Sequence, residues 1–79
     1  MYSEDIQKAL MNNGWIQPNP TKWFVYRKGQ FTCHILGHPV GKPDECIASI
    51  LDEDCEFFCH VIQSEAYLKI QLALIEAVL

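Results

Sequence analysis

The chain has 79 residues, a net charge of −4, and a composition that is 49% hydrophobic and 20% charged. This composition excludes a disordered chain, and the length fits one domain, residues 1–79, whose core supplies only about 3–5 kcal/mol of stability. Only six residues are Lys or Arg, and three of them, Lys22, Arg27 and Lys28, gather in one segment. The acidic balance argues against a broad nucleic-acid-binding surface, because non-specific affinity comes from clustered basic side chains.

The first predicted element is a helix over residues 4–13. Ser3 is placed to cap its N-terminus, and Ile6, Ala9 and Leu10 share one face. Gly14 is expected to end the helix in the left-handed conformation, with Trp15 packing back onto Leu10 as in a Schellman motif.

Residues 22–36 predict a β-hairpin, the element around which the sheet is built. A three-residue loop over Arg27, Lys28 and Gly29 needs positive φ only at the glycine, whereas a two-residue loop at Lys28 and Gly29 needs it at both. The longer loop sets Val25 opposite Phe31. The face expected in the core then carries Trp23, Val25, Phe31, Cys33 and Ile35, and the other face carries Phe24, Tyr26, Thr32 and His34.

Residues 43–54 are compatible with two structures. Pro43 followed by two acids favours a helix, with Ile47 and Ile50 on one face, and this is the preferred interpretation. The acidic run 52–54 instead suits a loop tip between two strands, because acids are unfavourable at a helix C-terminus.

The segment Cys55 to Gln63 predicts a strand that pairs with the hairpin. Its alternation is expected to place Phe57, Cys59 and Val61 in the core and Phe58, His60 and Ile62 on the other face.

A last helix is predicted over residues 65–78, with Ser64 as its N-cap. Two apolar stripes run along it: Leu68, Leu72, Ile75 and Leu79 on one, and Tyr67, Ile70, Leu74 and Ala77 on the other. A helix that is apolar around most of its circumference is buried on more than one side. Two explanations fit this pattern. Either both stripes are buried inside one domain, or one stripe lies in a dimer or partner interface.

The predicted fold is therefore an α+β two-layer sandwich. Its antiparallel sheet has three or four strands, and the helices over 4–13 and 65–78 pack on the sheet face that bears Trp23, Val25, Phe31, Cys33, Phe57 and Cys59.

Cysteine and histidine occur near each other in two segments, with Cys33, His34 and His38 in one and Cys55, Cys59 and His60 in the other. Adjacent strand residues point to opposite faces, so these segments lack the closely spaced ligand pairs that zinc sites use. A mixed set with His34 and His60 stays open, although buried thiols that act as small hydrophobes are expected instead. We predict no cofactor, no metal and no catalytic cysteine.

The segments EDIQKALMNNGW and FTCHILGHPVGKPDECIASIL resemble the small HicA ribonuclease toxins over residues 4–51. The resemblance implies an α-β-β-β-α domain related to double-stranded-RNA-binding folds, and RNA cleavage as an activity. That family carries its catalytic histidine in a Gly-Ser-His-type segment on the early strands, where this chain reads TKWFVYRKG. His34, on the next strand, is the nearest substitute.

The N-terminal residues lack the basic region of a signal peptide, and no apolar run approaches the roughly 20 residues that span a bilayer, so we expect a cytoplasmic, non-membrane protein with reduced thiols. We expect a small, non-enzymatic interaction or regulatory module that acts as a homodimer or on a larger protein partner. The alternatives are an RNA-cleaving toxin and an acidic inhibitor of a nucleic-acid-binding protein. The residues expected at the partner interface are Phe24, Tyr26, His34, Phe58, His60, Leu68, Leu72, Ile75 and Leu79.

Overall fold

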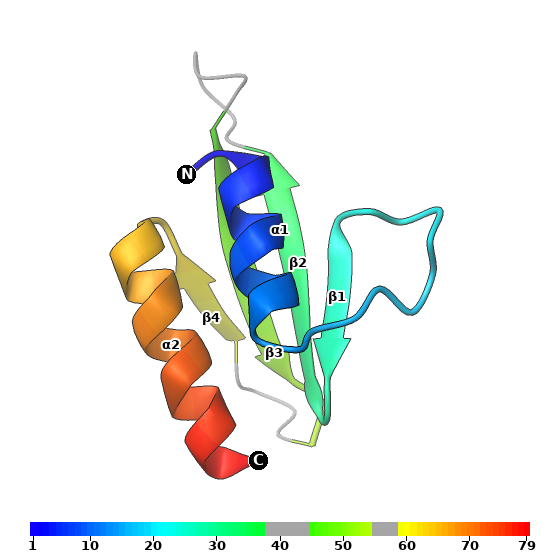
Figure 1. Cartoon of the computed structure of the whole chain (residues 1–79), viewed down its shortest axis with the longest axis vertical. Helices are drawn as coiled ribbons and strands as arrows, with labels where there is room; N and C mark the ends of the chain where they lie inside the picture. The colour runs from blue at the N-terminus through cyan, green and yellow to red at the C-terminus, as the bar shows by residue number, and fades with distance from the viewer. Residues whose placement is uncertain (38–44, 55–58) are drawn as a thin grey trace.

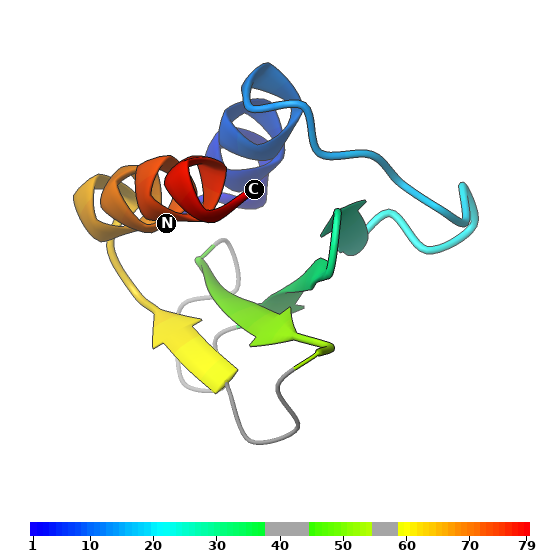
Figure 2. The ribbon, with the colours of Figure 1, turned by 90° about the horizontal axis from the view of Figure 1, so that it is seen from below.

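The computed structural model describes residues 1–37, 45–54 and 59–79 of the chain. The elements are α1 (Ser3–Asn12), β1 (Val25–Lys28), β2 (Phe31–Gly37), β3 (Cys46–Asp52), β4 (Cys59–Ile62) and α2 (Glu65–Val78). The strands form one antiparallel sheet in the order β1-β2-β3-β4. Both helices cover the same face of this sheet (Figures 1 and 2), which confirms the predicted α+β fold.

The end of α1 is the predicted Schellman motif. Gly14 has a φ of +81°, and the backbone N–H of Trp15 donates to the carbonyl of Leu10 at 3.0 Å. Trp15 is buried with Leu10 in the core. The prediction for the start of the helix is wrong in one detail, because the N-cap is Tyr2 and Ser3 is already helical.

The predicted hairpin register is wrong by three residues, because Val25 pairs with His34 and not with Phe31. Lys28 pairs with Phe31 and Tyr26 with Cys33, so the loop consists of Gly29 and Gln30 alone. Gly29 has a φ of +57°, whereas no described non-glycine residue has a positive φ. This pattern fits a two-residue type II′ turn, in which only the first central residue takes positive φ. Placing the glycine first in the loop removes the steric objection to a short hairpin.

The register shift exchanges the two faces of β1. Tyr26, predicted outside the core, is 1% exposed and lies in it. Val25, predicted in the core, pairs with His34 on the opposite sheet face. Trp23 precedes β1 and is 49% exposed, so its predicted place in the core is also wrong. The assignments of Phe31, Cys33 and Ile35 to the core are correct.

The preferred helix over residues 43–54 is wrong where the structure describes it, because Cys46–Asp52 forms strand β3. β3 pairs along its full length with β2, from Gly37↔Cys46 to Phe31↔Asp52, and with β4 on its other side. Ala48 and Ile50 are buried, at 0% and 1% exposed. Hydrogen bonding on both edges outweighs the helical spacing of the apolar residues.

The predicted alternation of β4 is inverted as well. Ile62, predicted outside the core, is 0% exposed, whereas Val61, predicted inside it, is 50% exposed. The register with β3 sets Ile62 opposite the buried Ala48. The predictions for Phe57, Phe58 and the side chain of Cys59 lie outside the described residues.

The core residues come from the sheet and from the two helices, which form the two layers seen in Figure 2. It consists of Ile6, Ala9, Leu10, Trp15, Tyr26, Phe31, Cys33, Ile35, Ala48, Ile50, Ile62, Leu68, Leu72 and Ile75. No helix among the described residues is long and apolar enough to cross a membrane.

Candidate functional site

Helix α2 begins at the predicted cap and buries one of its two apolar stripes. The Ser64 hydroxyl accepts a hydrogen bond from the backbone N–H of Tyr67 at 3.2 Å. Leu68, Leu72 and Ile75 are 0%, 1% and 6% exposed and pack into the core. The 4-3 spacing of these residues keeps them on one side of the helix, which faces the sheet and α1.

The second stripe of α2 faces solvent. Tyr67, Ile70, Leu74 and Val78 are 38%, 55%, 55% and 69% exposed. Exposed alanines, Ala66, Ala73 and Ala77, separate them. We call these seven residues the outer face of α2. No residue of the outer face carries a charge or a side-chain amide, which is unusual for a solvent-facing helix.

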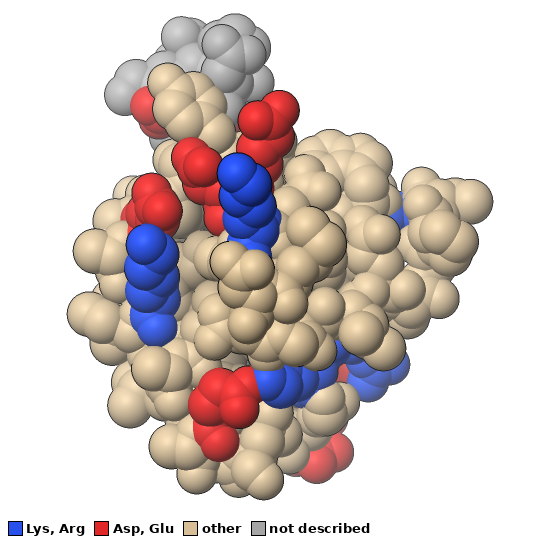
Figure 3. Space-filling view, in the orientation of Figure 1, with Lys and Arg blue, Asp and Glu red and all other residues tan. Residues whose placement is uncertain are grey.

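The charged residues of α2 form a separate stripe at the side of the helix. Lys69 pairs with Glu65 across one turn at 3.5 Å, and Glu76 pairs with Lys28 of β1. In the space-filling view, the charged side chains over α2 follow one line with uncharged surface beside it (Figure 3). Among the residues of α2, charged side chains therefore flank the outer face on one side only.

A pocket opens beside the C-terminal half of α2, with a volume of about 270 Å³. Four of its lining residues, Gln71, Leu74, Ile75 and Val78, follow the i, i+3, i+4, i+7 spacing. This is the spacing of the four residues that form a hole for a side chain of a facing helix. Phe31 and Asp52, from the sheet, complete the lining, so the pocket has an apolar floor and one carboxylate.

The Lys28 ammonium group fixes α2 against the rest of the fold. It donates to the carbonyl of Asn13 just after α1 and pairs with Glu76 on α2. Leu79 lies against the hairpin turn, where a Cβ built on Gly29 would come within 2.6 Å of its Cδ2 atom. These contacts hold the C-terminal half of α2 at the β1–β2 turn, so the walls of the pocket are positioned by several elements.

At the other end of α2, Tyr67 contacts strand β4. Its hydroxyl lies 2.6 Å from Nε2 of His60, and the two rings are tilted with centroids 5.1 Å apart. The hydrogen bond is exposed. The Tyr67 ring is thus part of the outer face and is held by an interaction that solvent can replace.

The sheet face opposite the helices carries a mixture of apolar and polar side chains. His34 is half-buried and pairs across the strands with Val25 of β1 and with Ser49 of β3. Thr32 is 5% exposed, and its hydroxyl donates to Glu53 at 2.6 Å, while Arg27 also pairs with Glu53 at 2.6 Å. Near Glu53 this sheet face is therefore polar, and the side chains of Thr32, Arg27 and Glu53 bond to one another.

The structure separates the predicted partner-binding residues. Tyr26, Leu68, Leu72 and Ile75 are core residues, so other parts of the folded chain cover their side chains. The remaining described ones lie apart: His34 on the open sheet face, His60 on β4, Phe24 just before β1 and Leu79 at the hairpin turn. Phe58 lies outside the described residues.

The predicted set does not include the exposed residues of the outer face, above all Ile70 and Leu74. The signal was present in the sequence as the second apolar stripe. The prediction placed the buried stripe at the partner interface, because spacing alone does not tell which side of a two-sided helix meets the sheet.

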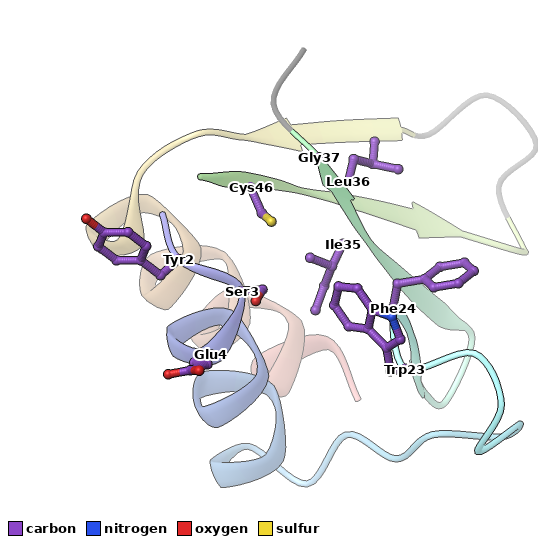
Figure 4. Close-up of a pocket in the computed structure, with 9 residues that line it drawn as sticks. All are labelled: Tyr2, Ser3, Glu4, Trp23, Phe24, Ile35, Leu36, Gly37 and Cys46. Carbon is purple, nitrogen blue, oxygen red and sulfur yellow. The ribbon is translucent and has the colours of Figure 1, made fainter. Parts of the chain in front are cut away.

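A larger hollow, of about 770 Å³, lies between the N-terminus of α1 and the end of the sheet where β1 begins and β2 ends. Figure 4 shows Ile35 and Cys46 between the helix and the aromatic pair Trp23 and Phe24. The two rings are perpendicular, with centroids 5.9 Å apart. The Glu4 and Tyr2 side chains point away from this pair, so the hollow does not gather convergent polar groups (Figure 4).

The core contains a hydroxyl with two hydrogen-bond partners and a buried thiol, whereas the buried Nε1 of Trp15 has no hydrogen-bond partner. The Tyr26 hydroxyl donates to Gln7 and accepts from Gln17, both at 3.2 Å. Burial raises the pKa of Tyr26, which the Gln17 hydrogen bond partly opposes. Burial also raises the pKa of the Cys33 thiol to about 12, which makes it a poor nucleophile at neutral pH.

Among the described residues, no three His, Cys, Asp or Glu side chains are grouped so that they could hold a metal ion. His38 and Cys55 of the two Cys/His segments lie outside those residues. Comparisons of the chain with protein-family models, with curated proteins and with solved structures find no match. The outer face of α2 and its adjoining pocket are therefore the candidate site, on geometry alone.

Proposed function

We propose that this chain is a small, non-enzymatic interaction module that acts as a homodimer, and that two copies associate through the outer face of α2. The observation that supports this is the exposure of Tyr67, Ile70, Leu74 and Val78, at 38–69%, on a face without charge. Leaving such a face in water is costly, and exposed apolar patches mark interaction sites.

The four large side chains of the face supply part of the area that a dimer interface needs. Large side chains present about 200 Å² when fully accessible, so these four offer on the order of 400 Å² per copy, about half of what one partner contributes to a standard interface. Three alanines and the adjoining pocket extend the same surface. A second copy matches it because the face is uniformly uncharged, and a two-fold dimer brings the same patch of both copies together.

Sedimentation velocity over a range of concentrations tests the proposal. The parent chain is expected to dimerise at micromolar concentration. Ile70→Asp, which buries a carboxylate in the interface, is expected to weaken the dimer at least 100-fold. Lys69→Gln is the matched control, because Lys69 lies in the charged stripe on the same turn and is expected to leave the dimer intact.

Circular dichroism establishes that each variant is folded. A folded parent chain that stays monomeric at 100 µM would overturn the homodimer, and so would a folded Ile70→Asp variant that dimerises like the parent. The RNA-cleaving and inhibitor hypotheses stay predictions, which no feature of the described residues favours over this one.

A further inference from the structure

We infer that the two α2 helices of the dimer pack antiparallel, with Tyr67 of each copy inserted into the pocket beside α2 of the other. The inference rests on the proposed homodimer and adds its geometry. The occupant is a side chain of a second copy, because the pocket, at about 270 Å³, has room for one large side chain and is smaller than most small-molecule sites.

Position along the helix selects Tyr67 as the side chain that enters. Two turns of an α-helix take about 7.2 residues, so Tyr67 and Leu74 lie almost on one line along α2. Leu74 is part of the pocket wall. In a two-fold dimer, an entering side chain and the pocket that receives it must lie along the same line of contact, and Ile70 points further from the pocket.

Antiparallel packing is the arrangement that lets both contacts form. The pocket centre lies between Leu74 and Ile75, about 11 Å along the helix from Tyr67 at 1.5 Å per residue. A two-fold axis level with Ile70 and Gln71 therefore brings each Tyr67 to the pocket of the other copy. In a parallel pair Tyr67 would lie beside Tyr67, two turns from either pocket.

The chemistry of the pocket matches a tyrosine. Its floor of Phe31, Leu74 and Val78 accepts the ring, and the Asp52 carboxylate accepts a hydrogen bond from the hydroxyl. On entering, Tyr67 exchanges its exposed hydrogen bond with His60 for a charge-assisted one with Asp52 of the second copy.

A pair of variants and their mixture test this geometry by native mass spectrometry and sedimentation velocity. Tyr67→Ala removes the entering side chain, and Gln71→Trp fills the pocket from its own rim. Each variant alone is expected to weaken self-association at least 10-fold. An equimolar mixture is expected to form a heterodimer more tightly than either homodimer. The reason is that the Tyr67→Ala copy presents only a methyl group to the filled pocket, while the Tyr67 side chain of the Gln71→Trp copy still enters an open one.

The outcomes separate this inference from the proposed function. If Ile70→Asp abolishes the dimer while Tyr67→Ala keeps the parent affinity, the homodimer stands and the Tyr67 contact is wrong. If both single variants weaken the dimer but the mixture forms no preferred heterodimer, the antiparallel exchange is wrong. Tyr67→Phe, which keeps the ring, is expected to weaken the dimer less than Tyr67→Ala, and an equal loss would overturn the role given to the ring.

Discussion

On its inner face α2 carries Leu68, Leu72 and Ile75, at most 6% exposed, whereas on its outer face Ile70, Leu74 and Val78 are 55–69% exposed. The two faces have nearly the same chemistry. What differs is that the inner one meets β4, the hairpin end and α1, while none of the described elements covers the outer one (Figures 1 and 2). The contrast shows that apolar character alone does not tell which face of a helix is buried within its own chain.

The largest expected effect comes from the inner face. Leu72→Ala removes a fully buried side chain and is expected to lower the free energy of unfolding by about 2–5 kcal/mol, by lost burial and by the cavity left behind. Urea unfolding monitored by circular dichroism measures it, at a concentration below that of dimerisation. Leu74→Ala is the matched control, expected to change monomer stability by no more than about 0.5 kcal/mol while weakening the dimer. Equal losses of monomer stability for both variants would remove the distinction between the two faces.

A smaller effect is expected where the core contains a polar group. Tyr26→Phe keeps the buried ring and removes the hydroxyl that bonds Gln7 and Gln17. The free energy of unfolding is expected to fall by roughly 0.5–1.5 kcal/mol per net hydrogen bond, because the two partly buried amides can turn to water. A double variant with Gln17→Ala should show non-additive losses, and strictly additive ones would contradict the hydrogen-bonded group.

At neutral pH the smallest effect concerns a thiol, because this effect appears only at high pH. The pKa of Cys33 is raised by burial from 9.0 to about 12 in the folded chain. Above pH 9 the unfolded chain loses the thiol proton while the folded chain keeps it, so the unfolded state binds fewer protons and stability falls as pH rises from about 9 towards 12. Urea unfolding at a series of pH values measures the slope. Cys33→Val should reduce the slope, and an unchanged slope would contradict the raised pKa.

The thiols offer a direct comparison of buried and accessible positions at neutral pH. Cys33 is buried and Cys46 is half-buried at the rim of the larger hollow. Iodoacetamide is expected to modify Cys46 in the native chain and to spare Cys33 until urea is added. Mass mapping of the modified peptides identifies the sites, and rapid native labelling of Cys33 would place it outside the core.

The helices were largely predictable from the sequence, for local reasons. Ser64 caps α2, and Gly14 ends α1 in the left-handed conformation, because these residues satisfy the orphan groups of a helix end wherever the helix lies. The assignments of Phe31, Cys33 and Ile35 to the core also hold, since they alternate along one strand. Each of these signals depends only on neighbours in the chain.

The candidate site was only half predictable. The sequence contained both stripes of α2 and left open whether both are buried in the domain or one lies at an interface. The predicted partner residues included Leu68, Leu72 and Ile75, which are buried. Pocket residues Phe31 and Asp52 come from the hairpin end of the sheet and meet α2 only in the folded chain. The periodicity of α2 cannot indicate that contact, because the contact involves residues of other elements.

The sequence by itself determined the α+β class, the positions of both helices and the two-sided character of α2, because helix ends and apolar periodicity are local properties. Only the tertiary structure decided the hairpin register at Gly29 and Gln30, the strand at Cys46–Asp52 and the buried side of α2. The physical reason is the same in all three: locally compatible alternatives differ by little free energy, and pairing with distant strands or packing against the other helix selects among them.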